Sequence, residues 1–133
     1  MSNITITNNA IGSVILHGAQ FRDGAVTFTG AGTLAEGTIL AVDSSTLKFV
    51  PFVKGGTTDE NGIPKAILTY DVTAAGAGDV QSRVAVAGSY RKELLIIAAD
   101  GDASNVDQAV TDQLRDYGLV SIDVQELNIL DNQ

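Results

Sequence analysis

The chain has 133 residues, of which 44% are hydrophobic and 18% charged, with a formal net charge of −8 at pH 7. These totals predict one globular domain that buries its own core, and they exclude a disordered or fibrous chain. Because the chain has no cysteine, disulfides and thiolate metal sites are excluded, and its acidic charge disfavours contact with nucleic-acid phosphates.

No apolar run approaches the roughly 20 residues that a membrane-spanning helix needs. The N-terminus, Met-Ser-Asn-Ile-Thr-Ile-Thr-Asn-Asn, lacks the basic and apolar regions of a signal peptide. We therefore expect a protein that is made in a cytoplasm and kept there until assembly, with neither a membrane nor a nucleic acid as partner.

The first ten residues are predicted to form an arm. Ile4 and Ile6 alternate with Thr5 and Thr7, a period of two that is typical of a β-strand. A β-prone segment at a terminus can add to the sheet edge of another chain. We therefore predict an arm over residues 1–10 and a domain over residues 11–133; an edge strand within the domain, or a frayed end, is the alternative.

Two strands are predicted next, around residues 13–16 and 25–29, with a turn at Asp23-Gly24 between them. His17 is the only histidine, and a lone histidine is far more often a surface or hydrogen-bonded residue than a metal ligand. The following Thr-Gly-Ala-Gly-Thr segment lacks the Lys-Ser or Lys-Thr pair of a phosphate loop and is interpreted as a flexible joint.

A β-hairpin is predicted in the centre of the chain. Two apolar runs, residues 38–42 and 47–53, flank an Asp-Ser-Ser-Thr turn. A polar loop over residues 55–62 ends in Asn61-Gly62, a strong turn signal, and a further strand is expected over residues 67–72. A second flexible joint is expected at residues 74–78.

Residues 80–99 predict two more strands, over 84–88 and 94–99, the second buried on both faces because it is continuously apolar. Arg91 and Lys92 between them are the only adjacent basic pair. They form either a solvated turn or a contact for an acidic surface.

A helix is expected after residue 104. Ser104 is the predicted N-cap, with Asp107 three residues later, and Gly118 the predicted C-terminal end. The apolar face of this helix comprises Val106, Ala109, Val110, Leu114 and Tyr117. The preceding Asp100-Gly-Asp segment resembles a calcium loop but lacks its central glycine and closing glutamate. A last strand is predicted from Leu119 onward, with Val120, Ile122 and Val124 alternating.

Four segments in a fixed order resemble the lambda-type head decoration proteins of tailed bacteriophages. They are Ile39-Leu40 before the Asp43-Ser-Ser turn, Leu47-Lys-Phe-Val, Gly56-Thr-Thr-Asp and Ala66-Ile-Leu-Thr. A looser match continues through residues 84–88 and 94–100 to the helix ending at Gly118. The resemblance implies a compact, mainly β domain with one C-terminal helix (an α+β class), the β-tulip fold, preceded by an extended arm.

The resemblance also implies the function. Such proteins bind the exterior of the expanded capsid as trimers at threefold positions and stabilise it, with the major capsid protein as partner and no catalysis or cofactor. The homotrimer forms on the capsid, and the subunit can be monomeric in solution. In this interpretation the arm residues Asn3, Ile4, Thr5, Ile6 and Thr7 contact the capsid, the protein is made in the host bacterial cytoplasm, and the acidic charge suits the outer virion surface.

Two other classes of function stay open. A β-rich accessory module that binds another protein, without catalytic activity, is the main alternative; a sugar-binding module is disfavoured because the chain has no Trp and 3 Tyr. A small enzyme using carboxylates and a metal is the other. A Ser-His-Asp arrangement would have to use His17, and paired carboxylates such as Asp59-Glu60 lie in turn-like polar runs, so we predict no catalytic, cofactor-binding or metal residues.

Overall fold

The computed structural model describes residues 15–122, and the predicted boundary between arm and domain lies outside them. The elements in chain order are β1 (Ile15–Phe28), β2 (Gly32–Leu34), β3 (Ile39–Val42), β4 (Phe49–Pro51), β5 (Ala66–Leu68), β6 (Val72–Ala74), β7 (Gly78–Arg91), the 3-10 helix η1 (Lys92–Leu94), α2 (Gln108–Asp116) and β8 (Leu119–Ile122). The predicted class, mainly β with one C-terminal helix, is confirmed.

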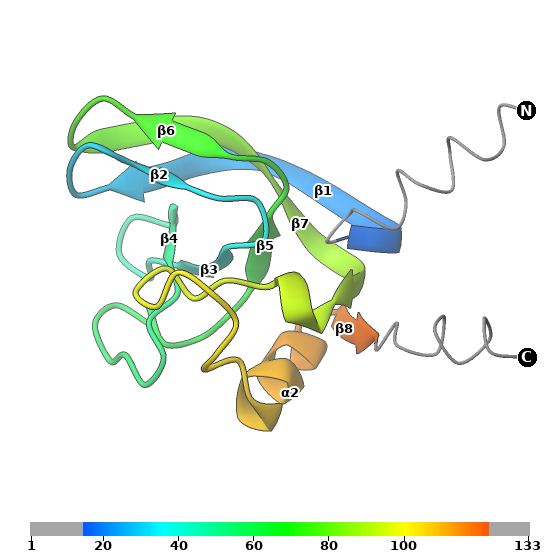
Figure 1. The fold of residues 1–133 in the computed structure, drawn as a ribbon. Helices are drawn as coiled ribbons and strands as arrows, with labels where there is room; N and C mark the ends of the chain where they lie inside the picture. The colour runs from blue at the N-terminus through cyan, green and yellow to red at the C-terminus, as the bar shows by residue number, and fades with distance from the viewer. Residues whose placement is uncertain (1–14, 123–133) are drawn as a thin grey trace, which may run out of the picture.

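Five strands close into a barrel (Figure 1). Their order is β1-β4-β3-β5-β7, and β1 also pairs with β7, which closes the ring. β8 continues the sheet beyond β7 as a parallel strand. β2 and β6 form a separate two-stranded ribbon between the ends of β1 and β7.

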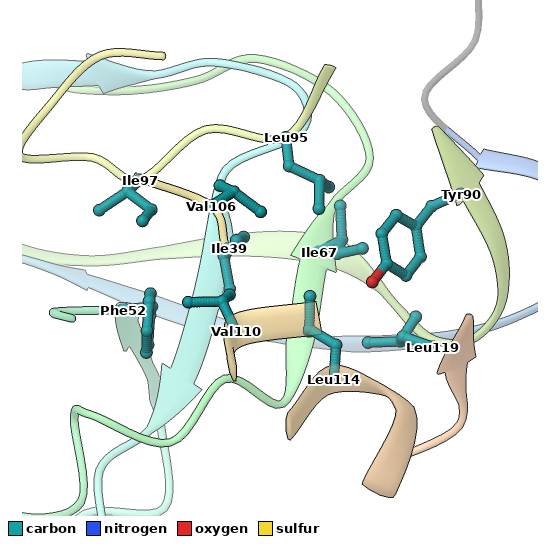
Figure 2. Packing of buried hydrophobic residues seen from close by; sticks show 10 residues of the cluster. All are labelled: Ile39, Phe52, Ile67, Tyr90, Leu95, Ile97, Val106, Val110, Leu114 and Leu119. Atoms are coloured by element: carbon teal, nitrogen blue, oxygen red, sulfur yellow. The ribbon is translucent and has the colours of Figure 1, made fainter. Parts of the chain in front are cut away.

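Two apolar cores lie on opposite faces of the same strands. Leu40 and Leu68 belong to one core, whereas their neighbours Ile39 and Ile67 belong to the other, because successive side chains of a strand point to opposite faces. Figure 2 shows the second core, where side chains from α2 and the loop before it meet the strands. This explains why β3 and β5 are continuously apolar: both of their faces are buried.

The predicted turn at Asp23-Gly24 is wrong, because both residues lie inside β1 and pair with Arg83 and Ser82 of β7. Asp23 accepts a hydrogen bond from Arg83 Nε across the pair at 3.1 Å. Gly24 is required by packing: a Cβ atom there would lie 2.6 Å from Phe49 Cε2. A dipeptide that is typical of turns serves here as an ion-pair partner and a contact surface for a buried ring.

The central hairpin is confirmed as β3 and β4, with Val42 opposite Phe49. The strand predicted over residues 67–72 is instead divided between β5 and β6, which belong to different sheets. Between them the Asp71 carboxylate accepts a hydrogen bond from the Glu36 backbone N–H at 2.8 Å, and Thr69 Oγ1 donates to the Arg83 carbonyl at 2.7 Å. These side-chain bonds redirect the chain from one sheet to the other.

The predicted strands over residues 84–88 and 94–99 also need correction. The first is part of the longer β7, and the second is not a strand but η1 followed by two isolated bridges, Thr38 to Ile96 and Ile97 to Asp102. Only alternate side chains of this segment are fully buried, namely Leu95 and Ile97. Its continuous apolar sequence reflects one buried face and one partly covered face.

The predicted helix is confirmed as α2, but its cap is Asp107 and not Ser104. The Asp107 carboxylate accepts a hydrogen bond from the Val110 backbone N–H at 3.1 Å. Val110 and Leu114 are buried as predicted, together with Val106.

Two residues of the predicted helix face are exposed instead, Ala109 and Tyr117. Gly118, at φ +91°, follows the helix as predicted. β8 buries Leu119 and exposes Val120, whereas Val124 lies outside the described residues.

We expect Gly24→Ala to destabilise the fold by about 1–3 kcal/mol, since the new methyl group would overlap the buried Phe49 ring. Urea unfolding at neutral pH measures the change. Gly30→Ala is the matched control, because no atom lies within 4 Å of its added Cβ. Equal stabilities of the two variants would contradict the packing argument.

The buried Tyr90 side chain makes the stability of the fold depend on alkaline pH. Burial raises its pKa to about 12, against a smaller opposing effect of the Ser121 hydroxyl; the unfolded value is about 10. The folded state therefore disfavours the phenolate, and this contribution to stability is complete below pH 10 and disappears as the pH rises toward 12. We expect urea unfolding between pH 8 and 12 to show a steeper alkaline loss in the wild type than in Tyr90→Phe. Parallel pH profiles would contradict this.

Candidate interaction surfaces

The predicted contact residues Asn3, Ile4, Thr5, Ile6 and Thr7 lie outside the described residues. The structure does define where the chain enters and leaves the fold. Tyr90 of β7 pairs with Ile15, the first residue of β1, and with Ser121 of β8. The segments before Ile15 and after Ile122 therefore attach at the same end of the barrel (Figure 1).

The opposite end of the β1–β7 pair is uncharged. It carries the turn between β1 and β2 and the turn between β6 and β7, and neither residues 27–35 nor residues 72–78 include a charged side chain. The Thr33 and Thr73 hydroxyls are hydrogen-bonded to each other across the β2–β6 ribbon at 2.9 Å. In a chain of net charge −8, this end offers the least electrostatic repulsion to an acidic neighbour.

A hollow of about 260 Å³ opens at this uncharged end. It is lined by residues 27–34 and by Pro51 at the end of β4. We call it the turn hollow. Phe28 is almost fully buried at its lining, while Gly30, Ala31 and Gly32 carry little or no side chain to fill it. The hollow is therefore open and mostly apolar.

Leu47 is the most exposed large apolar side chain of residues 18–121, at 72%. It follows the turn between β3 and β4 and has a φ of +62°, which is unfavourable for a leucine. Asp43 holds this turn: its carboxylate accepts hydrogen bonds from the Ser45 and Thr46 backbone N–H groups, and its carbonyl accepts from Leu47 N at 2.7 Å. The turn is thus built around a fixed and outward-facing leucine.

Sequence reasoning missed this feature. The Asp-Ser-Ser-Thr run correctly predicted the turn, but nothing in the residue type of Leu47 indicates a left-handed conformation, which favours Gly, Asn and Asp. The other two non-glycine residues with positive φ within residues 15–122 are Asp59 and Glu60. They lie beside the same turn, since the Asp59 carbonyl accepts a hydrogen bond from Ser44 N at 3.0 Å.

Several surface carboxylates are held in their ionised form. Hydrogen bonds from Ser45 and Thr46 lower the pKa of Asp43. The Lys48 ammonium lowers the pKa of Asp79, and the Lys54 ammonium, 2.6 Å from Asp107, lowers the pKa of that carboxyl. General acid catalysis near neutral pH needs a shift in the other direction, so these groups serve as caps and ion-pair partners.

The other charged residues that the sequence analysis singled out do not form a cluster. The Glu60 carboxylate lies 4.0 Å from Lys65. Asp100 accepts a hydrogen bond from the Asn105 side-chain amide within its own loop. Arg91 forms an ion pair with Glu93 at 3.0 Å, and Lys92 is exposed.

The side chain of His17 lies outside those that the structure describes. Within residues 15–122 no group of three or more His, Asp or Glu residues could hold a metal ion. None of the helices in that range is long and apolar enough to cross a membrane.

The chain matches a known protein family. The family model described as bacteriophage lambda head decoration protein D matches residues 4–119, which include the whole barrel and α2. No curated protein sequence matches the chain. Because the family model covers most of the chain, and because the mainly β architecture with one helix is the one that the resemblance implied, this protein belongs to the bacteriophage lambda head decoration protein D family.

Proposed function

We propose that this protein binds the exterior of an expanded tailed-phage head, contacts the major capsid protein, and assembles there as homotrimers at threefold positions. The observation that carries the proposal is the family match over residues 4–119. In this function the protein is made in the host cytoplasm, acts on the virion surface and performs no catalysis.

The physical basis is selective binding to one state of the lattice. A ligand that binds the expanded shell and not the unexpanded shell stabilises the expanded state by its differential affinity. Each copy needs to contribute only a few kcal/mol, because an icosahedral shell offers the same site many times. No bound cofactor or chemical step is required.

The net charge supports an exterior location. At −8, the surface repels the phosphates of a packaged genome and leaves the protein on the outer side of the shell. The barrel supports the arm hypothesis, because residues 1–10 precede a strand, β1, that is paired with β7 from its first residue. An arm attached there is anchored on a 14-residue strand that is paired with β7 from end to end.

We expect the protein to co-sediment saturably with expanded, undecorated shells of its phage, and not with unexpanded shells, at a ratio of three copies per threefold position. Quantitative gel densitometry of the pelleted particles measures this ratio. Absence of binding to both particles would contradict the decoration function and favour the protein-binding module without a capsid partner.

We expect deletion of residues 1–10 to weaken binding to expanded shells at least tenfold while the urea-unfolding midpoint stays unchanged. Because β-strand addition would depend on one face of the arm, Ile4→Ser with Ile6→Ser should reproduce the loss. Asn8→Ser with Asn9→Ser, outside the assigned contacts, is the matched control. Shell binding that survives the deletion would contradict the assignment of Asn3, Ile4, Thr5, Ile6 and Thr7 as contacts.

A further inference from the structure

The turn hollow has the size of a site for one side chain. Pockets for small ligands enclose roughly 300–1,000 Å³, whereas a cavity of about 150 Å³ already holds a benzene-sized apolar group. At about 260 Å³, the hollow is smaller than a typical small-ligand pocket and larger than a benzene-sized cavity. Residues 27–34 and Pro51 are uncharged, and the larger side chains among them are apolar, namely Phe28, Leu34 and Pro51. The fitting occupant is an aliphatic side chain carried by a protein.

The same chain presents such a side chain. Leu47 exposes 72% of its surface, and its left-handed backbone conformation is strained for a leucine. Non-glycine residues in this conformation concentrate at functional sites, where the surrounding structure compensates the strain. Here the compensation comes from Asp43, whose carboxylate accepts hydrogen bonds from Ser45 and Thr46 and whose carbonyl accepts from Leu47.

Two exposed aromatic side chains, Tyr70 and Tyr117, have partners within the subunit. The Tyr70 hydroxyl accepts a hydrogen bond from the Arg83 backbone N–H at 3.2 Å. The Tyr117 ring lies 5.4 Å from the Lys65 ammonium. Leu47 differs from both, because it is more exposed and purely aliphatic, and it therefore gains most from transfer into an apolar hollow.

The charge on Lys48, the residue after Leu47, is already compensated. Lys48 pairs with Asp79, which also accepts a hydrogen bond from Thr27 Oγ1 at 2.9 Å. Thr27 lines the hollow, so the Leu47 turn and the hollow are located on the same side of the barrel and joined by this network.

Leu47 of one subunit does not fill the hollow of that subunit, because it is exposed and is absent from the hollow lining. β4 (Phe49–Pro51) separates them. A contact between the two features therefore has to be made by different copies.

We propose that Leu47 of one copy inserts into the turn hollow of the next copy, and that three such head-to-tail contacts close a ring. Interfaces that join two different patches give rings when the rotation closes. The number three rests on the proposed function, in which the copies gather at threefold positions. The pairing of Leu47 with the hollow rests on the described structure alone.

Disulfide trapping tests the contact directly, since the natural chain contains no cysteine. Leu47→Cys chains are mixed with Ala31→Cys chains under oxidised glutathione, both in solution at high concentration and on expanded shells. We expect a disulfide between positions 47 and 31 and none when either variant is oxidised alone. Tyr70→Cys mixed with Ala31→Cys is the matched control, because Tyr70 is also exposed and lies outside the proposed contact.

The stoichiometry of the trapped species tests the ring. A chain carrying both Leu47→Cys and Ala31→Cys should yield covalent trimers on denaturing gels. Covalent dimers alone would indicate a twofold pair, and a ladder of higher species an open chain; both results would overturn the proposed ring. No disulfide between 47 and 31, in solution or on shells, would overturn the contact itself.

Variants of Leu47 test the contact between copies separately from the binding of the protein to the capsid. Leu47→Asn retains a residue that tolerates positive φ but removes the aliphatic group, so we expect an unchanged fold by circular dichroism and at least a tenfold loss of self-association. Leu47→Met, which keeps an apolar side chain, should retain association.

The shell experiments then separate the two proposals. If the wild type binds shells and Leu47→Asn binds them equally well as trimers, the contact is wrong and decoration stands. If Leu47→Asn loses shell binding while no 47–31 disulfide forms, Leu47 contacts the capsid protein and the contact between copies is overturned. If the wild type does not bind shells at all, the decoration function fails, and trapping in solution still decides the contact.

Discussion

The pairing of β1 with β7 is the interaction on which the rest of the structure depends. Each strand has 14 residues, and their register runs from Ile15 opposite Tyr90 to Phe28 opposite Gly78. This pair closes the barrel, and β7 also carries β5 and β8 on its other edge. The two strands are far apart in the sequence, so the fold gains its closure only after a long segment of chain has been ordered.

Side chains complete the sheet where strand pairing stops. β5 pairs with β7 only at Ile67 opposite Ala85 and Leu68 opposite Val84. At the next position on β7, Thr69 donates to the Arg83 carbonyl and the Tyr70 hydroxyl accepts from the Arg83 backbone N–H. Because backbone groups near a core need partners, these two residues satisfy the Arg83 backbone where the chain leaves one sheet for the β2–β6 ribbon.

The fold gives the molecule two chemically distinct ends, which suits a protein that decorates a lattice. One end of the β1–β7 pair holds the attachment points of both chain termini, and the other is an uncharged surface with the turn hollow. The attachment point of the proposed arm and the surface proposed to bind the next copy are thereby separated by the length of the barrel. Apolar cores on both faces of β3 and β5 hold the barrel between them together.

The sequence by itself determined the class of the fold, the central hairpin, the helix with its terminal glycine, and the family, because these follow from local patterns of turn residues and apolar spacing and from their order. Only the tertiary structure decided the features that depend on distant partners. Asp23-Gly24 became part of a strand because Arg83 and Phe49 approach it from other strands. The segment around Leu95 became a loop because one of its faces covers the barrel. The left-handed conformation of Leu47 has no local signal in its residue type, since it is imposed by hydrogen bonds that Asp43 accepts and by the neighbouring loop at Asp59.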